Sequence, residues 1–266
     1  MSGSLVIEKR GAVDWVTLDR PERLNALDAS LIAALSQYFG DLARNRETRV
    51  VVLRGAGRAF CAGLDLNEDH GVADTIDRLE LQRSIAEIVM RMRYCPQPIV
   101  SLVHGAACGG GFALALASDI RVAGESVRMN AAFIRIGLSA CDIGVSYFLP
   151  RLVGASVAAE LMLTGAFIEA PRAFALGLVS RVVPDKDLEA AALPIVDQML
   201  GASPLGLRLT KECLRMSLDA PGLEAVIAME DRNQVMCSSA PEFQEGVAAF
   251  LQKRRPAYAS ALEPTA

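Results

Sequence analysis

Two glycine-rich loops carry the residue types and spacing that could polarise a carbonyl group. The first spans residues 54–66, follows an apolar run and contains three glycines. The second is the run Gly109, Gly110 and Gly111, which precedes an Ala- and Leu-rich helical pattern at residues 112–117. Glycine lets other groups approach the backbone closely, and the first N–H groups of a helix have no intrahelical partner. Two such N–H groups that converge on one point would stabilise an oxyanion or an enolate.

A glycine-rich turn between a strand and a helix can also be a tight connection or a phosphate cradle. Phe112 and Ala113 follow the second glycine run, where a phosphate-binding loop needs Lys and then Ser or Thr. The pattern therefore argues against a nucleoside triphosphate site. The chain has two histidines and six cysteines, and no two cysteines have CxxC spacing. We therefore expect no metal site.

The composition excludes several classes of partner. A net charge of −4, from 27 basic and 31 acidic residues, argues against nucleic-acid binding, including RNA binding. The one basic run, residues 253–255, is typical of a solvated helix end. No apolar stretch has the length and lack of charge that a membrane span needs. Scattered cysteines and the absence of a signal-peptide pattern at residues 1–10 indicate a cytoplasmic protein.

The elements that must position the two loops follow from the apolar periodicity. Strand patterns occur at residues 5–8, 13–18, 50–53, 99–103 and 120–122, and Asp28 is a suitable N-cap for a helix after the second strand. Both glycine-rich loops follow a predicted strand. Strands that alternate with helices predict an α/β fold of β-β-α crossover units. Helical patterns dominate after Gly144. We expect a β-β-α core over residues 1–200 and a helical C-terminal region over residues 201–266.

Five motifs resemble those of the crotonase (enoyl-CoA hydratase/isomerase) superfamily, in the same order and register. They lie at residues 20–27 (RPERLNAL), 59–66 (AFCAGLDL), 104–111 (HGAACGGG), 161–165 (LMLTG) and 175–179 (ALGLV). The resemblance implies an α/β superhelix, or spiral, of β-β-α turns with a helical C-terminal trimerisation region. It also implies a homotrimer or a hexamer built as a dimer of trimers.

The resemblance further implies an acyl-CoA thioester as the substrate, with no cofactor beyond the coenzyme A that the substrate carries. The oxyanion hole would consist of the backbone N–H groups of Leu64 and Gly110. The residues matching the family's coenzyme A contacts are Arg23, Ala26, Ala62, Asp65, Leu66, Phe250 and Lys253. Of these, Arg23 and Ala26 would lie near the coenzyme A moiety, and Ala62, Asp65 and Leu66 beside its adenine. Phe250 and Lys253 would reach it from a neighbouring helix or subunit.

The chain departs from the hydratase pattern at both catalytic glutamates. Ala113 and Phe133 occupy the two matching positions, and neither side chain can exchange a proton. General acid–base catalysis contributes roughly 10²–10⁴-fold per group, so classical hydration is not expected. Phe112, Ala113 and Phe133 would instead line an apolar acyl site, which favours a hydrophobic acyl chain or ring.

Asp142 is the best remaining candidate for a catalytic carboxylate. It precedes Ser146-Tyr147, and it resembles the nucleophilic Asp of the chlorobenzoyl-CoA dehalogenase branch and an Asp of the dihydroxynaphthoyl-CoA synthase branch. The dehalogenase's His and Trp positions are Ala86 and Phe133 here, which does not support dehalogenation. The alternative for Asp142 is an N-cap of the helix that begins near Gly144.

Three further alternatives remain open. Glu68 and Asp69 could supply the carboxylate from a neighbouring loop. A hydrolase-like member that uses Asp142 is a second alternative. The third is a catalytically silent acyl-CoA-binding homologue, which the loss of both glutamates favours.

Overall fold

The large sheet organises the molecule. The computed structural model describes residues 3–68 and 73–258. In it, six strands run in the order β1-β2-β3-β4-β6-β9. Their bounds are β1 Leu5–Arg10, β2 Val13–Leu18, β3 Val50–Gly55, β4 Ile99–Val103, β6 Ile120–Gly124 and β9 Arg181–Val183. β1 is antiparallel to β2, and the other neighbours are parallel.

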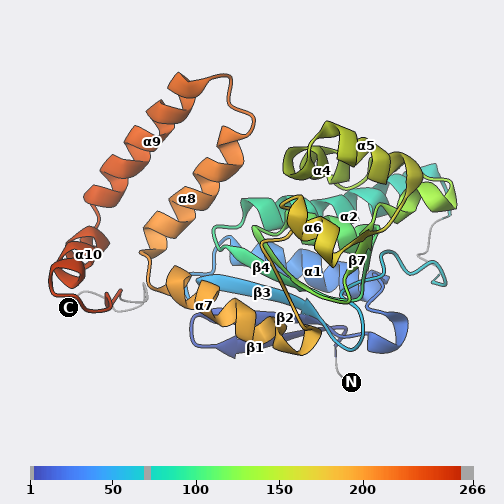
Figure 1. The fold of residues 1–266 in the computed structure, drawn as a ribbon, viewed down its shortest axis with the longest axis horizontal. Helices are drawn as coiled ribbons and strands as arrows, with labels where there is room; N and C mark the ends of the chain where they lie inside the picture. Colours follow the sequence, from blue (N-terminus) through green and yellow to red (C-terminus); the bar gives the residue numbers. More distant parts are fainter. Residues whose placement is uncertain (1–2, 69–72, 259–266) are drawn as a thin grey trace.

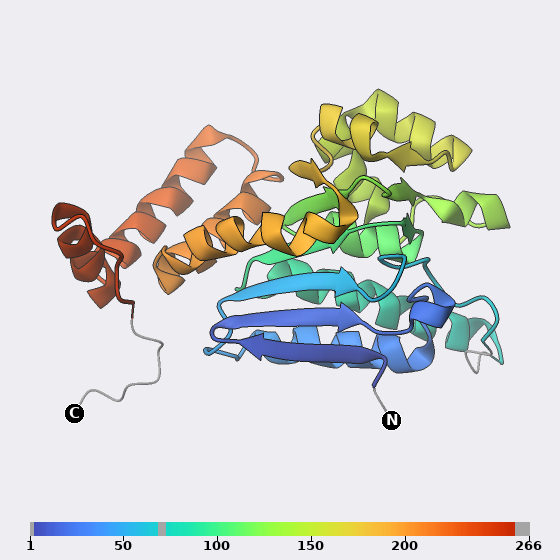
Figure 2. The same ribbon diagram turned by 60° about the horizontal axis from the view of Figure 1, so that its bottom comes forward.

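The two faces of this sheet bury alternate residues of each strand. On β3, Val51 and Leu53 belong to the larger core, whereas Val50 and Val52 belong to the smaller one. Side chains alternate between the faces of a strand with a period of two, so an unbroken apolar run identifies a strand covered on both sides. The helix α7 (Leu188–Leu200) covers the smaller core, and Figure 2 shows it running along one face of the strands. The predicted α/β class is confirmed.

The helices α1 (Ala29–Leu42), α2 (Thr75–Tyr94) and α3 (Gly110–Ala117) contribute to the larger core. Asp28 caps α1 as predicted, because its carboxylate accepts a hydrogen bond of 2.7 Å from Leu31 N. All eight residues of α3 are buried. The second glycine run therefore opens a helix inside the protein, where groups around its N-terminus are shielded from water.

A second, three-stranded sheet, which the sequence patterns did not predict, holds the turn before α3. It has the order β5-β7-β8, with β5 at Ala106–Cys108, β7 at Arg128–Asn130 and β8 at Ile168–Glu169. A parallel bridge joins Cys61 to Ala107. The first glycine-rich loop is thereby attached to the segment that leads into the second glycine run.

The remaining helices lie in the second half of the chain. They are α4 (Val145–Val153), α5 (Ala155–Thr164), α6 (Ala170–Ala175), α8 (Pro204–Ser217), α9 (Leu223–Ser238) and α10 (Pro241–Leu251). Three 3-10 turns lie at Pro21–Arg23, Ala132–Ile136 and Asp185–Asp187. Figure 1 shows α8, α9 and α10 projecting from the body of the molecule. Lys211 on α8 attaches this projection through an ion pair of 2.8 Å to Asp119. No helix among the described residues is long and apolar enough to cross a membrane.

Candidate functional site

The segments that carry Leu64 and Gly110 pack directly against each other. A Cβ added to Gly63, whose φ is +99°, would lie 2.8 Å from Cys108 O and 3.5 Å from Gly110 N. The first contact is too close for any side chain, so glycine is required at position 63. The close approach of the two backbones therefore depends directly on the glycine pattern.

Neighbouring backbone groups are paired, but the two predicted donors are not. Leu27 N donates to Gly63 O at 2.7 Å, and Asp65 N donates to Leu27 O at 3.0 Å. These two bonds form a parallel bridge between Leu27 and Leu64 that does not use Leu64 N. Gly109 N donates to Asn130 O at 3.0 Å, and Gly110 is the first residue of α3. Within residues 3–68 and 73–258, neither Leu64 N nor Gly110 N donates a backbone hydrogen bond. Two N–H donors thus remain available on adjacent segments.

Tight packing at Gly111 orients the start of α3. A Cβ at Gly111 would lie 2.1 Å from Cys61 O, so no other residue fits there. Burial also raises the pKa of the Cys61 thiol to about 12. The thiol therefore stays neutral near neutral pH and serves as a small core side chain.

The positions of the two missing glutamates are apolar in three dimensions as well as in sequence. Ala113 is fully buried one turn into α3. The Phe133 ring lies 3.4 Å from the position that a Cβ on Gly109 would occupy. Phe133 is therefore next to the turn that carries Gly110. Neither side chain offers a proton donor or acceptor.

Asp142 directly precedes Ile143, and the alternative that Asp142 caps α4 is wrong. The N-cap of α4 is Gly144, with no side-chain cap. Instead, Asp142 Oδ1 accepts hydrogen bonds from Ile143 N at 2.8 Å and from Gln82 Nε2 on α2 at 2.5 Å. Gln82 was not singled out from the sequence, because no local pattern connects two residues so far apart.

Ile143 connects Asp142 to the turn. Its Cδ1 atom lies 3.8 Å from the position of a Cβ on Gly110. Its φ of +33° is unusual for a β-branched residue. Backbone strain of this kind costs about 1–3 kcal/mol and concentrates at functional sites. The half-buried Asp142 thus directly precedes a residue whose side chain approaches Gly110.

Arg20 links the predicted coenzyme A-binding segments to each other. Its guanidinium forms ion pairs with Asp28 at 2.9 Å and Asp65 at 3.1 Å, and donates to Ala26 O. Burial alone would raise the pKa of Asp65, but the Asn67 N–H and Arg20 hold it below its ordinary value. The Asp65 carboxylate is therefore engaged within the protein.

The other predicted coenzyme A contacts differ in accessibility. Arg23 is exposed, and its guanidinium has no ion pair within the described part of the chain. Leu66 is 64% exposed, Ala62 is half-buried and Ala26 is buried. Glu68 accepts a hydrogen bond from Ala29 N at 3.2 Å, whereas Asp69 lies outside the described residues.

The structure does not bring Phe250 and Lys253 to these segments within one chain. Phe250 is 83% exposed on α10, and Lys253 follows that helix. Figure 1 shows α10 at the opposite end of the molecule from the loop after β3. Contact from a neighbouring subunit remains a prediction for these two residues.

Among the described residues, no cluster of His, Cys, Asp and Glu side chains could hold a metal ion. The site therefore consists of backbone donors, one carboxylate and apolar side chains. That set of groups can bind and polarise a carbonyl compound.

Comparisons with known proteins identify the family that shares this arrangement. Residues 8–261 match the family described as enoyl-CoA hydratase/isomerase. The chain is 38% identical to a probable enoyl-CoA hydratase of Mycobacterium tuberculosis, over 96% of this chain and 92% of that protein. It is 34% identical to the 1,2-epoxyphenylacetyl-CoA isomerase of Escherichia coli, over 91% of this chain and 93% of that protein.

Solved structures agree with the sequence comparison. An enoyl-CoA hydratase from Bacillus anthracis superimposes with a TM-score of 0.91 at 31% identity, covering 96% of this chain and 98% of that chain. The chain belongs to the enoyl-CoA hydratase/isomerase family, within the crotonase superfamily. It is an acyl-CoA-processing enzyme of that type.

Proposed function

We propose that the enzyme binds the thioester carbonyl of an acyl- or enoyl-CoA between the N–H groups of Leu64 and Gly110. The observation that carries this proposal is that, among the residues the structure describes, both N–H groups lack backbone partners, on segments that approach each other at Gly63. Two fixed donors would stabilise the oxygen of an enolate as charge develops on it, and one such donor is worth roughly 10²–10³-fold in rate. The partial positive charge at the N-terminus of α3 adds to this stabilisation.

The coenzyme A moiety would lie along the segments that Arg20 links. The exposed guanidinium of Arg23 is available to a phosphate group, and Arg side chains bind phosphates with paired hydrogen bonds. Ala26, Ala62 and Leu66 would contact the remainder, whereas Asp65 would act through its backbone and its pairing with Arg20. No cofactor is needed beyond the coenzyme A of the substrate.

Asp142 would exchange the proton at the substrate α-carbon. Gln82 Nε2 and Ile143 N both donate to its Oδ1 atom, and within the described residues Oδ2 has no partner. Oδ2 is therefore available to take a proton. With Ala113 and Phe133 in place of the glutamates, we propose an isomerase-like or other enolate reaction in preference to water addition.

A silent acyl-CoA-binding protein is the second candidate, because Ala113 and Phe133 leave the site without the hydratase acids. Calorimetric titration with octanoyl-CoA and free coenzyme A tests binding, and α-proton exchange of octanoyl-CoA in D₂O tests enolate formation. We expect tighter binding of the thioester and measurable exchange. Binding without exchange would favour the silent candidate, and a failure of all thioesters in a chemically varied panel to bind would exclude both.

We propose in addition that the region 201–266 assembles the enzyme into a trimer or hexamer. Large apolar side chains are exposed along it, including Leu223, Val235, Phe243, Phe250 and Leu251. Burial of such side chains in an interface is favourable. Analytical ultracentrifugation measures the assembly directly. All six cysteines are free thiols, which supports a cytoplasmic location.

A further inference from the structure

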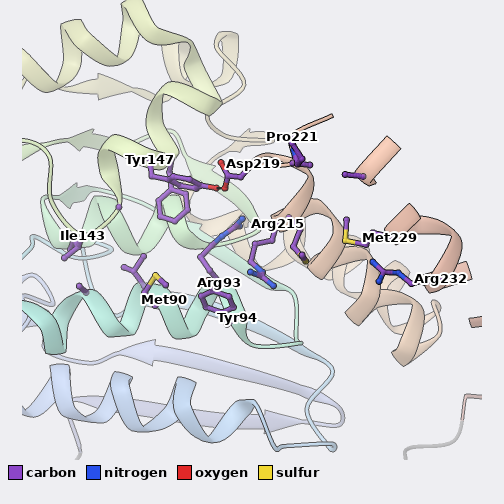
Figure 3. Close-up of a pocket in the computed structure, with 17 residues that line it drawn as sticks. Met90, Arg93, Tyr94, Ile143, Tyr147, Arg215, Asp219, Pro221, Met229 and Arg232 are labelled. Atoms are coloured by element: carbon purple, nitrogen blue, oxygen red, sulfur yellow. Dashed lines mark hydrogen bonds between the residues drawn. The ribbon is translucent and has the colours of Figure 1, made fainter. Parts of the chain in front are cut away.

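A cavity of about 740 Å³ lies between α2, the start of α4 and the helices α8 and α9. Figure 3 shows it extending from Ile143 towards Met229 and Arg232. Ile143 lines one end, and the same side chain approaches Gly110. The cavity therefore begins beside the proposed oxyanion hole, where the acyl group of a bound thioester would enter it.

The walls of the cavity are mostly apolar, and its volume is in the usual range for small-molecule sites. Val89, Met90, Phe148, Met216 and Met229 are among the lining side chains. Methionine is unbranched and adaptable, so these walls suit a flexible hydrocarbon chain. The body of the acyl group would therefore be aliphatic.

The polar groups of the cavity have an excess of positive charge. Arg93, Arg215 and Arg232 line it, and Asp219 is the one carboxylate among its described lining residues. Asp219 is already engaged, because Tyr147 donates to it and Arg151 forms an ion pair of 2.9 Å with it. The hydrogen bond from Tyr147 and then the contact with Arg151 lower the pKa of Asp219. Asp219 is therefore engaged mainly by Tyr147 and Arg151, and within the described residues it forms no ion pair with Arg215 or Arg232.

Arg215 is the best placed of the three guanidiniums. It stacks over the Tyr94 ring at 4.2 Å, which holds it at the cavity wall, and Figure 3 shows it beside Arg93. Arg93 lies 3.8 Å from Asp119, which also pairs with Lys211, and the charge of Arg93 helps to lower the pKa of Asp219. Within the described residues Arg215 has no ion-pair partner. A half-buried guanidinium that faces an apolar cavity favours an anionic ligand group.

We propose that the acyl group of the substrate ends in a carboxylate, which Arg215 binds with help from Arg93. The substrate would then be the coenzyme A monothioester of a dicarboxylic acid with an aliphatic body. This inference rests on the proposed function, since the thioester end must lie at Leu64 and Gly110. A neutral fatty acyl group would fill the cavity but would leave Arg215 without an ion-pair partner among the described residues.

Two saturated thioesters of equal chain length test the inference. Neither has a double bond, so neither can be hydrated during the binding measurement. Octanoyl-CoA and suberyl-CoA both carry eight carbons, and only suberyl-CoA has a terminal carboxylate. Calorimetry on the full-length enzyme should give about 10- to 100-fold tighter binding of suberyl-CoA, since a charge-assisted hydrogen bond is worth ~1.5–3 kcal/mol. Arg215→Gln should remove this preference. Arg208 lies two turns earlier on the same helix, is exposed and does not line this cavity, so Arg208→Gln should retain the preference.

The outcomes separate the two proposals. If the wild-type enzyme binds octanoyl-CoA as tightly as suberyl-CoA, or if Arg215→Gln weakens both equally, the carboxylate assignment is wrong and the proposed function stands. If neither thioester binds more tightly than free coenzyme A, both proposals fail. The comparison of the two thioesters on the wild-type enzyme needs no variant, so it tests the carboxylate assignment even if Arg215→Gln does not fold.

Discussion

Replacement of Gly63 by alanine should damage both the stability and the chemistry of the enzyme. The residue has φ +99°, and its added Cβ would lie 2.8 Å from Cys108 O and 3.5 Å from Gly110 N. The left-handed conformation alone costs an alanine about 1–2 kcal/mol. Relief of the overlap with Cys108 O must move the two backbones apart, which adds a similar amount. We expect a total loss of about 2–4 kcal/mol in the free energy of unfolding.

The same movement should affect catalysis, because it separates Leu64 N from Gly110 N. Removal of one oxyanion donor lowers rates by roughly 10²–10³-fold, so α-proton exchange should fall by about this factor. Urea denaturation measures the stability, and mass spectrometry of octanoyl-CoA recovered from D₂O measures the exchange.

Gly177→Ala is the matched control. Gly177 has φ +74°, and nothing lies within 4 Å of its added Cβ. This variant therefore pays the conformational cost without the overlap, and its exchange rate should equal that of the wild type. The reasoning is refuted if Gly63→Ala is no less stable than Gly177→Ala and exchanges α-protons at the wild-type rate.

Three further predictions follow from contacts at the site and at the C-terminal helices. Asp142→Asn should lower α-proton exchange by about 10²–10⁴-fold while the Kd for octanoyl-CoA changes by less than about 3-fold; unchanged exchange would remove Asp142 from the mechanism. Arg20→Gln should cost about 2–3 kcal/mol in urea denaturation at pH 7, because Asp28 and the buried Asp65 lose a common partner. The folded-state pKa of Asp65 is lowered, so this contribution is present above the ordinary value of 3.8 and is lost as the pH falls below it. The difference between Arg20→Gln and the wild type should therefore shrink below about pH 4, and a constant difference would contradict the assignment. Lys211→Met should lower the free energy of unfolding by about 3 kcal/mol, because Lys211 pairs with Asp119 at 2.8 Å and donates to Gln97 O at 2.8 Å. A melting temperature equal to that of the wild type would show that other contacts attach α8 to the body.

Local patterns predicted most of the elements of the large sheet but not the small one. Val50, Val51, Val52 and Leu53 form an unbroken apolar run, and a strand buried on both faces is its simplest interpretation. The strand β5 was not predicted, because a segment of three residues is too short to show a period of two. Such a short strand forms because it pairs with neighbouring strands, and those strands are distant in the sequence.

The candidate site likewise has features that could be predicted from the sequence and features that could not. The glycine-rich loops that contain Gly63 and Gly110 could be singled out because a close approach of two backbones requires glycine. This requirement is visible in the sequence as the residue type itself. The hydrogen bond from Gln82 to Asp142 could not be predicted in this way, since many residue types could occupy the exposed position 82 of α2. The alternative that Asp142 caps α4 is wrong for a related reason: the chain passes through Ile143 and Gly144 at positive φ before the helix begins.

The sequence by itself determined the α/β class, the superfamily resemblance, and the replacement of both glutamates by Ala113 and Phe133. These properties depend on residue identity and local spacing. The tertiary structure decided that Leu64 N and Gly110 N lie on adjacent segments and have no backbone partner in the described part of the chain. It also decided that Arg215 faces a cavity that begins at Ile143. Such facts arise where separate elements pack together, and the spacing within any one element does not specify them.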